Sequence, residues 1–146
     1  MSSPRFTAES LKFLRGLKRN NRRDWFNARR EAYETHVRLP MLAVIERLSD
    51  DLRDFAPEIV ASPKTSMYLI YRDVRFSENK APYKTHVAAN FPTRAEHLRY
   101  RQFLAGCEFP PALATTPRFY ANLIKVFRQV APLARFLNQP LLHWLS

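Results

Sequence analysis

Apolar side chains recur every three or four positions through the first 55 residues. The spacing is clearest over 41–55, where six charged residues lie around the other side and the apolar stripe is Met41, Val44, Ile45, Leu48, Leu52 and Phe55. Such spacing predicts an amphipathic helix. It also predicts helices over 7–19, with Thr7 as N-cap, and over 24–39, with Asp24 as N-cap. The N-terminal third of the chain is therefore expected to be helical.

A different texture begins at Ser66. Residues 67–76 (MYLIYRDVRF) are rich in aromatic and β-branched side chains, and residues 84–91 (KTHVAANF) follow after a stretch of turn residues. These features predict two short strands that pair as an antiparallel hairpin. Because helices come first and strands after, the expected fold class is α+β, with an N-terminal helical layer packed on an antiparallel sheet.

Several classes of protein are excluded or disfavoured by what the chain of 146 residues lacks. With Gly16 and Gly106 as its two glycines, it holds no glycine-rich phosphate loop. With Cys107 as its one cysteine, it can form neither an internal disulfide nor a zinc knuckle. We predict no metal and no cofactor, because the histidines lack the spacing of metal ligands; they are His36, His86, His97 and His143.

The start of the chain and its apolar runs bear on location. No run of 18 apolar residues exists, so we predict no transmembrane segment. The first residues (MSSPRFTAESLKF) lack the apolar core of a secretory signal, so we expect a cytoplasmic protein. The sequence leaves open the oligomeric state and whether the protein is an enzyme.

Two stretches carry a family resemblance: FLRGLKRNNRRDWFNARREAYE (13–34) and PKTSMYLIYRDVRFSENKAPYKTHVAANF (63–91). With the helical segment between them, they resemble domain-of-unknown-function family 2461 over about residues 6–92. The resemblance implies an intracellular α+β protein with no established activity. Members of the family continue after the position of Phe91 into glycine-rich strands that complete the sheet.

This chain departs from that pattern after Phe91. Its last 55 residues hold six prolines and one glycine, which would follow from a shifted reading frame or from a divergent C-terminus. We therefore expect an incomplete family-like domain over 1–92 and a divergent tail over 93–146, rich in Pro, Arg and Leu, whose order remains open. Part of the tail, 119–137, keeps helical spacing across Pro132, which predicts a kinked amphipathic helix.

Seven functional side chains lie within fifteen positions of the predicted hairpin: Arg72, Asp73, Arg75, Lys80, Tyr83, Lys84 and His86. If residue numbers across the hairpin sum to 159, Arg75 faces Lys84 and Asp73 faces His86 on one surface. An anion bound between Arg75 and Lys84 would relieve the repulsion between these two positive charges. We therefore expect a small phosphorylated or carboxylate ligand over residues 72–86.

The roles expected at this site follow from side-chain chemistry. The candidate ligand-binding residues are Arg72, Arg75, Lys80 and Lys84, joined by Asn20 and Asn21 if their turn packs over the hairpin. The candidate catalytic residues are His86, as a proton donor oriented by Asp73, and Tyr83, as a charge stabiliser.

Other interpretations stay open. In a purely structural one, Arg72 or Arg75 pairs with Asp73, with Glu78 or with an acidic helix residue, and Tyr83, Trp25 and Phe26 pack in the core. In a nucleic-acid-binding one, phosphates meet the basic cluster over 15–30, which comprises Arg15, Lys18, Arg19, Arg22, Arg23, Arg29 and Arg30. A membrane-surface role for the cationic segment 118–139 is a third alternative.

Overall fold

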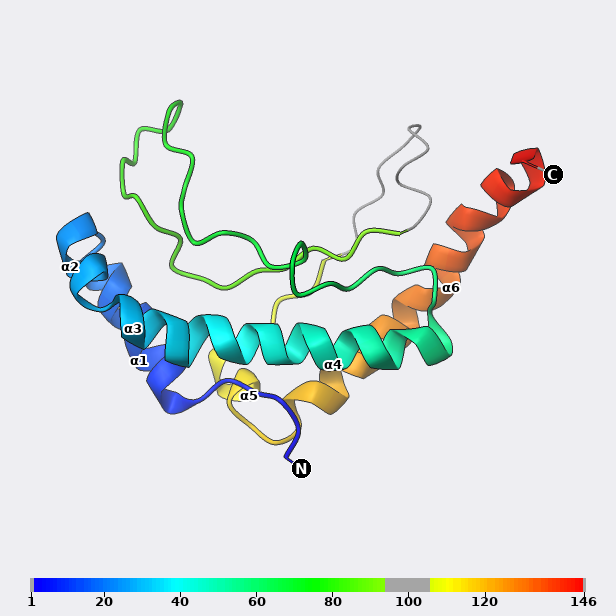
Figure 1. The fold of residues 1–146 in the computed structure, drawn as a ribbon, viewed down its shortest axis with the longest axis horizontal. Coiled ribbons are helices and arrows are strands. Elements are labelled where there is room, and N and C mark those ends of the chain that lie inside the picture. The colour runs from blue at the N-terminus through cyan, green and yellow to red at the C-terminus, as the bar shows by residue number, and fades with distance from the viewer. Residues whose placement is uncertain (1, 94–105, 146) are drawn as a thin grey trace.

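Helices account for every regular element of the chain in the computed structural model, which describes residues 2–93 and 106–145 (Figure 1). His97, considered above as a metal ligand, lies outside the described residues. The elements in chain order are α1 (Ala8–Arg19), α2 (Arg23–Ala28), α3 (Arg30–Tyr33), the π-helical η1 (Glu34–Arg38), α4 (Leu39–Phe55), α5 (Pro111–Ala114) and α6 (Phe119–Leu145).

Helix α1 confirms the predicted helix over 7–19, and its ends show why it forms there. Ser10 N–H donates to Thr7 Oγ1 over 3.4 Å and Thr7 N–H donates to Ser10 Oγ over 3.0 Å, so the side chain of each residue satisfies the otherwise unpaired amide of the other. At the other end, Asn20 donates from its backbone and from its side chain to the carbonyl of Gly16. Both helix ends are therefore closed by local hydrogen bonds.

The predicted helix over 24–39 is wrong in its continuity. It divides at Arg29, where the backbone leaves helical geometry (φ −120°, ψ 20°), into α2 and a second piece that continues through η1 into α4. Pro40 lacks an N–H and its ring crowds the carbonyl of His36, so the turn before it widens into η1. The result is one long rod, coloured cyan to green-blue in Figure 1. Its α4 part confirms the predicted helix over 41–55.

The expected α+β fold is wrong: no strand and no sheet form among the described residues. Residues 67–71 and 83–89 lie on either side of a turn and run antiparallel. Their backbones pair only as isolated bridges, two of which are Met67–Ala89 and Tyr71–Tyr83. The paired residue numbers do not keep a constant sum, so the register shifts and interrupts any ladder. Pro82 accepts from Arg72 N–H but has no N–H to return. We call residues 66–91 the hairpin loop.

Two apolar clusters hold the helices and the hairpin loop together. The N-terminal core joins α1, α2 and the start of the rod to the hairpin loop, and contains Phe13, Leu17, Phe26, Tyr33, Val37, Ile70 and Tyr83. The C-terminal core joins α4 to α6, and its buried residues include Val44, Leu48, Leu52, Phe119, Tyr120, Leu123, Ala131 and Ala134. The predicted helix over 119–137 is confirmed as α6, which continues through Pro132. No helix in the described part of the chain is both long and apolar enough to cross a membrane.

Candidate functional site

A reciprocal pair of hydrogen bonds attaches the hairpin loop to the helices. Asn21 donates from Nδ2 to the carbonyl of Tyr83 over 2.9 Å, and Tyr83 N–H donates to Asn21 Oδ1 over 3.0 Å. The Tyr83 ring is buried and stacks on Phe26, with centroids 4.2 Å apart and planes inclined by 22°. Two residues expected at a ligand site, Asn21 and Tyr83, thus make the contact that positions the loop.

Burial changes the chemistry available to Tyr83. It raises the pKa of the phenol above its ordinary value, so the hydroxyl is a weaker acid than that of an exposed tyrosine. Asn20, the other asparagine expected at the site, donates its side chain to the Gly16 carbonyl over 3.1 Å at the end of α1. Its role in this structure is to cap the helix.

The hairpin register differs from the expected one. Tyr71 lies opposite Tyr83, and Lys84 N–H donates to the Ile70 carbonyl over 2.7 Å. Arg75 therefore does not face Lys84, and Asp73 does not face His86. Burial explains the difference, because Ile70 and Tyr83 both belong to the N-terminal core and a shifted register would turn them toward water.

Arg75 and Asp73 form a bidentate ion pair within one limb of the loop. Arg75 Nε lies 3.0 Å from Asp73 Oδ1, and Arg75 Nη2 lies 2.7 Å from Asp73 Oδ2. These hydrogen bonds hold the pKa of the Asp73 carboxyl below its ordinary value. The structural interpretation is thus confirmed for this pair. Because Asp73 is engaged by Arg75, it does not orient His86, which is exposed and makes no hydrogen bond to any described residue.

The other three cations of the expected site bind backbone carbonyls of the loop. Arg72 Nη1 donates to Ala81 over 3.1 Å. Lys80 Nζ donates to Val74 over 2.8 Å, and Lys84 Nζ donates to Leu69 over 2.7 Å. These side chains replace part of the hydrogen bonding that a regular strand ladder would supply.

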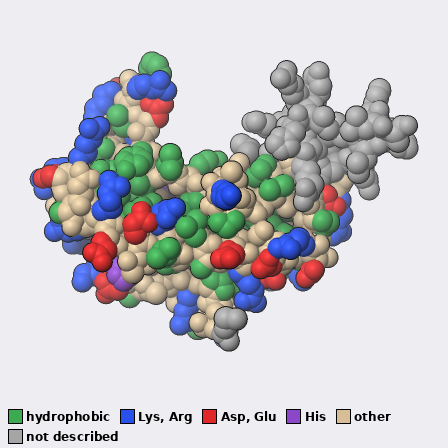
Figure 2. Space-filling model, in the orientation of Figure 1, with side chains coloured by type: hydrophobic (Ala, Val, Ile, Leu, Met, Phe, Trp, Pro, Cys, Tyr) green, Lys and Arg blue, Asp and Glu red, His purple; other side chains and the backbone are tan. Residues whose placement is uncertain are grey.

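The fold brings together two basic clusters that are separate in sequence. Besides the contacts of Tyr83, an interaction with Tyr71 raises the pKa of Arg30. We call residues 15–30 together with the hairpin loop the basic lobe. It holds eleven Lys and Arg against three Asp and Glu, a net +8 of the chain's +11. Figure 2 shows these cationic side chains over the projecting end of the loop and the helices beneath it.

Exposed aromatic rings accompany the cations of the basic lobe. Tyr68 is 50% exposed with Lys84 Nζ 5.3 Å from its centroid, and Phe76 is 97% exposed with the Arg75 guanidinium 5.8 Å from its centroid. The sequence did not predict the exposure of these rings, because the aromatic content of 67–76 indicates only a strand. The signal was present in the segment itself, where Tyr71 is followed by Arg72 and Phe76 follows Arg75.

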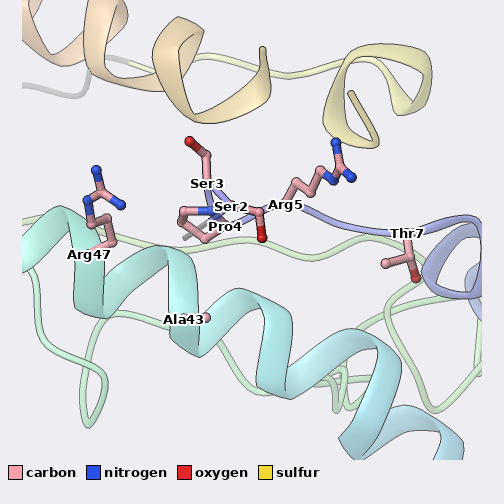
Figure 3. A pocket seen from close by; sticks show the side chains of 7 residues that line it. All are labelled: Ser2, Ser3, Pro4, Arg5, Thr7, Ala43 and Arg47. Atoms are coloured by element: carbon pink, nitrogen blue, oxygen red, sulfur yellow. The ribbon is translucent and has the colours of Figure 1, made fainter. Parts of the chain in front are cut away.

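A shallow groove of about 400 Å³ lies elsewhere, where the N-terminal segment crosses α4 (Figure 3). It is lined by residues 2–5 with Thr7, Ala43 and Arg47, none of which belongs to the basic lobe. Arg47 is also paired with Asp51, their Nε and Oδ2 atoms lying 3.4 Å apart. In residues 2–93 and 106–145, no group of three or more His, Cys, Asp or Glu side chains could hold a metal ion.

Comparison with known proteins gives one match. The model of a family described as conserved hypothetical protein (DUF2461) matches residues 9–97, which include α1 to α4 and the hairpin loop. Helices α5 and α6 lie outside that match. No curated protein and no solved structure matches the chain.

Proposed function

The chain belongs to the DUF2461 family of conserved hypothetical proteins, and from that premise we propose that it binds nucleic acid through the basic lobe. The family description names no activity, so the proposal depends on the surface of this chain. One observation carries it: two basic clusters, far apart in sequence, form a single lobe with a net charge of +8. A polymer of phosphates is the ligand class that such an extended positive surface suits best.

The cations of α1 support an extended ligand. Arg15, Lys18 and Arg19 are exposed and form no ion pair with any described residue, so a phosphate would not have to displace a carboxylate from them. Each such contact would release a counterion condensed on the nucleic acid. The energetic gain comes from many weak contacts along the lobe, and a deep pocket is not required.

The salt dependence of binding tests the proposal. We expect a fluorescein-labelled 20-nucleotide oligonucleotide to bind with an affinity that falls steeply with salt. The triple variant Arg15→Gln, Lys18→Gln, Arg19→Gln should bind more weakly and reduce the slope of log K against log salt by about 2. The matched control removes three exposed cations outside the lobe, by Lys64→Gln, Arg118→Gln and Lys125→Gln. Absence of binding by the wild type, or equal loss in both triple variants, would refute the proposal.

A small anion bound over residues 72–86 is the second candidate. In its favour, Lys80 and Lys84 each spend one of three N–H donors on a carbonyl, so donors remain for an oxyanion. Against it, Arg75 could bind the anion only by breaking its bidentate ion pair with Asp73. A thermal-shift titration with inorganic phosphate decides: the candidate requires stabilisation of the wild type that Lys84→Ala removes and Lys64→Ala does not.

A further inference from the structure

Resting on the proposed nucleic-acid binding, we propose that the basic lobe prefers single strands to duplexes, because unpaired bases stack on the exposed rings of Tyr68, Tyr71 and Phe76. All three rings lie on one limb of the hairpin loop, within nine positions of the chain. Base stacking would explain why these rings are exposed, which the positive charge of the basic lobe alone does not.

Exposed apolar side chains are concentrated on this limb. Among the described residues, seven large hydrophobic side chains are exposed, and four of the seven lie between positions 68 and 76: Tyr68, Leu69, Tyr71 and Phe76. The fold has room for buried rings elsewhere, since Phe13, Phe26 and Tyr33 pack together in the N-terminal core. A limb that keeps its rings in water, next to a core that accepts rings, is typical of a surface that contacts a ligand.

Two of the three rings have a cation beside them. Lys84 Nζ lies 5.3 Å from the ring centroid of Tyr68, and the Arg75 guanidinium lies 5.8 Å from that of Phe76. Proteins that bind single strands combine these two elements, because a base stacks on the ring while its phosphate meets the cation. The cation also attracts the electron-rich face of the ring and so holds the ring in place before the base arrives.

The strandedness preference follows from the geometry of the bases. In a duplex, bases already stack on one another and present only their edges in the grooves, so an aromatic ring on the protein surface gains little. The cations contact phosphates in either form. Removal of the rings should therefore weaken single-strand binding selectively, whereas removal of cations should weaken both.

Fluorescence anisotropy of the full chain, with a 20-nucleotide oligo(dT) strand and a 20-base-pair duplex at one salt concentration, separates these effects. We expect the double variant Tyr68→Ala, Phe76→Ala to bind the single strand at least tenfold more weakly and the duplex within twofold of the wild type. Tyr71 is left intact because its ring contacts Tyr83, with centroids 5.6 Å apart, and its loss would disturb the fold. The matched control is Phe136→Ala, an exposed ring on α6 that should leave both affinities unchanged.

Three results would overturn the inference, and they differ in what they say about the proposed function. If the double variant binds the single strand like the wild type, while Arg15→Gln, Lys18→Gln, Arg19→Gln weakens binding, the stacking is wrong and the nucleic-acid proposal stands. If the wild type binds neither form, both are wrong. A duplex affinity equal to or above the single-strand affinity of the wild type would likewise overturn the preference and leave nucleic-acid binding intact.

Discussion

Asn21 takes the place of a neighbouring strand for Tyr83. Its amide accepts from the Tyr83 N–H and donates to the Tyr83 carbonyl, at 3.0 and 2.9 Å, which is the pairing that a strand partner would provide. The two residues are 62 positions apart. A single side chain in the turn after α1 therefore fixes where the hairpin loop meets the helices.

Replacement of Asn21 should destabilise the protein by leaving both backbone groups of Tyr83 without their partners. We expect Asn21→Ala to lower the free energy of unfolding by about 1–3 kcal/mol. Asn21→Asp should cost at least as much, because a carboxylate oxygen would then face the Tyr83 carbonyl. Urea denaturation measures both. Asn27→Ala, at an exposed position of α2, is the control, and an equal loss in that variant would show that Asn21 has no special role.

Gly16 and Trp25 should be energetically coupled. A Cβ at position 16 would lie 2.9 Å from Trp25 Cζ2, and the ring cannot retreat freely between Phe13 and the Arg29 guanidinium, whose centroid distances are 5.7 and 4.4 Å. Gly16→Ala should therefore destabilise the wild type, although alanine favours a helix over glycine by about 1 kcal/mol.

A double-mutant cycle tests this explanation. In a Trp25→Leu background the obstruction is gone, so Gly16→Ala should change sign and stabilise the protein. Tryptophan fluorescence of the single Gly16→Ala variant should also report a displaced ring. If Gly16→Ala has the same effect in both backgrounds, the close approach does not control the stability.

Tyr120 should make the stability of the C-terminal core sensitive to alkaline pH. Burial, assisted by its 2.5 Å hydrogen bond to Asp51, raises the pKa of Tyr120. The folded protein then keeps a proton that the unfolded chain releases above about pH 10, so stability is present below that pH and is lost as the pH rises from there toward the folded pKa.

Comparison with Tyr120→Phe isolates this contribution. At pH 7 to 9 the variant should be less stable by about 2 kcal/mol, because the hydrogen bond to Asp51 is lost. Between pH 10 and 11 the difference should shrink. Tyr33 and Tyr83, whose pKa values burial also raises, are present in both proteins and cancel. A difference that stays constant from pH 8 to pH 11 would contradict the prediction.

Helix α6 should contribute to the stability of the family-matched part although it lies outside the match. Ala134 is 3% exposed in the core shared with α4, where a larger side chain would have to displace its packed neighbours. We expect Ala134→Leu to lower the free energy of unfolding by about 1–3 kcal/mol. Its neighbour Leu133 is 43% exposed, so Leu133→Ala should change stability by less than about 0.5 kcal/mol. Equal small effects would mean that α6 does not pack as described.

The helices could be predicted because their signals are local. Thr7 caps α1, and the apolar positions of α4 and α6 repeat within a few residues, so neighbouring residues contain the information. The break at Arg29 was not predictable in this way. It depends on Phe26 and Tyr33 reaching one core from two helical pieces, which is a tertiary requirement.

The hairpin loop shows the opposite case. Its aromatic and β-branched composition suits a strand, and the antiparallel course was foreseen, but the register and the absence of a ladder were not. The register depends on contacts distant in the sequence, above all that of Asn21 with Tyr83, 62 positions apart. The pairing of Arg75 with Asp73 was among the alternatives that composition allowed, and the bidentate geometry selects it.

The side chains of Arg72, Lys80 and Lys84 each end on a carbonyl oxygen of the hairpin loop itself. An oxygen engaged in this way is a poorer acceptor for a strand from another molecule, and two such loops of like charge repel each other. A segment whose composition would favour intermolecular sheets is therefore kept apart from its copies. This protection depends on charge. Molar salt reduces the range of electrostatic repulsion to about 3 Å, so we expect the protein to aggregate at that salt concentration.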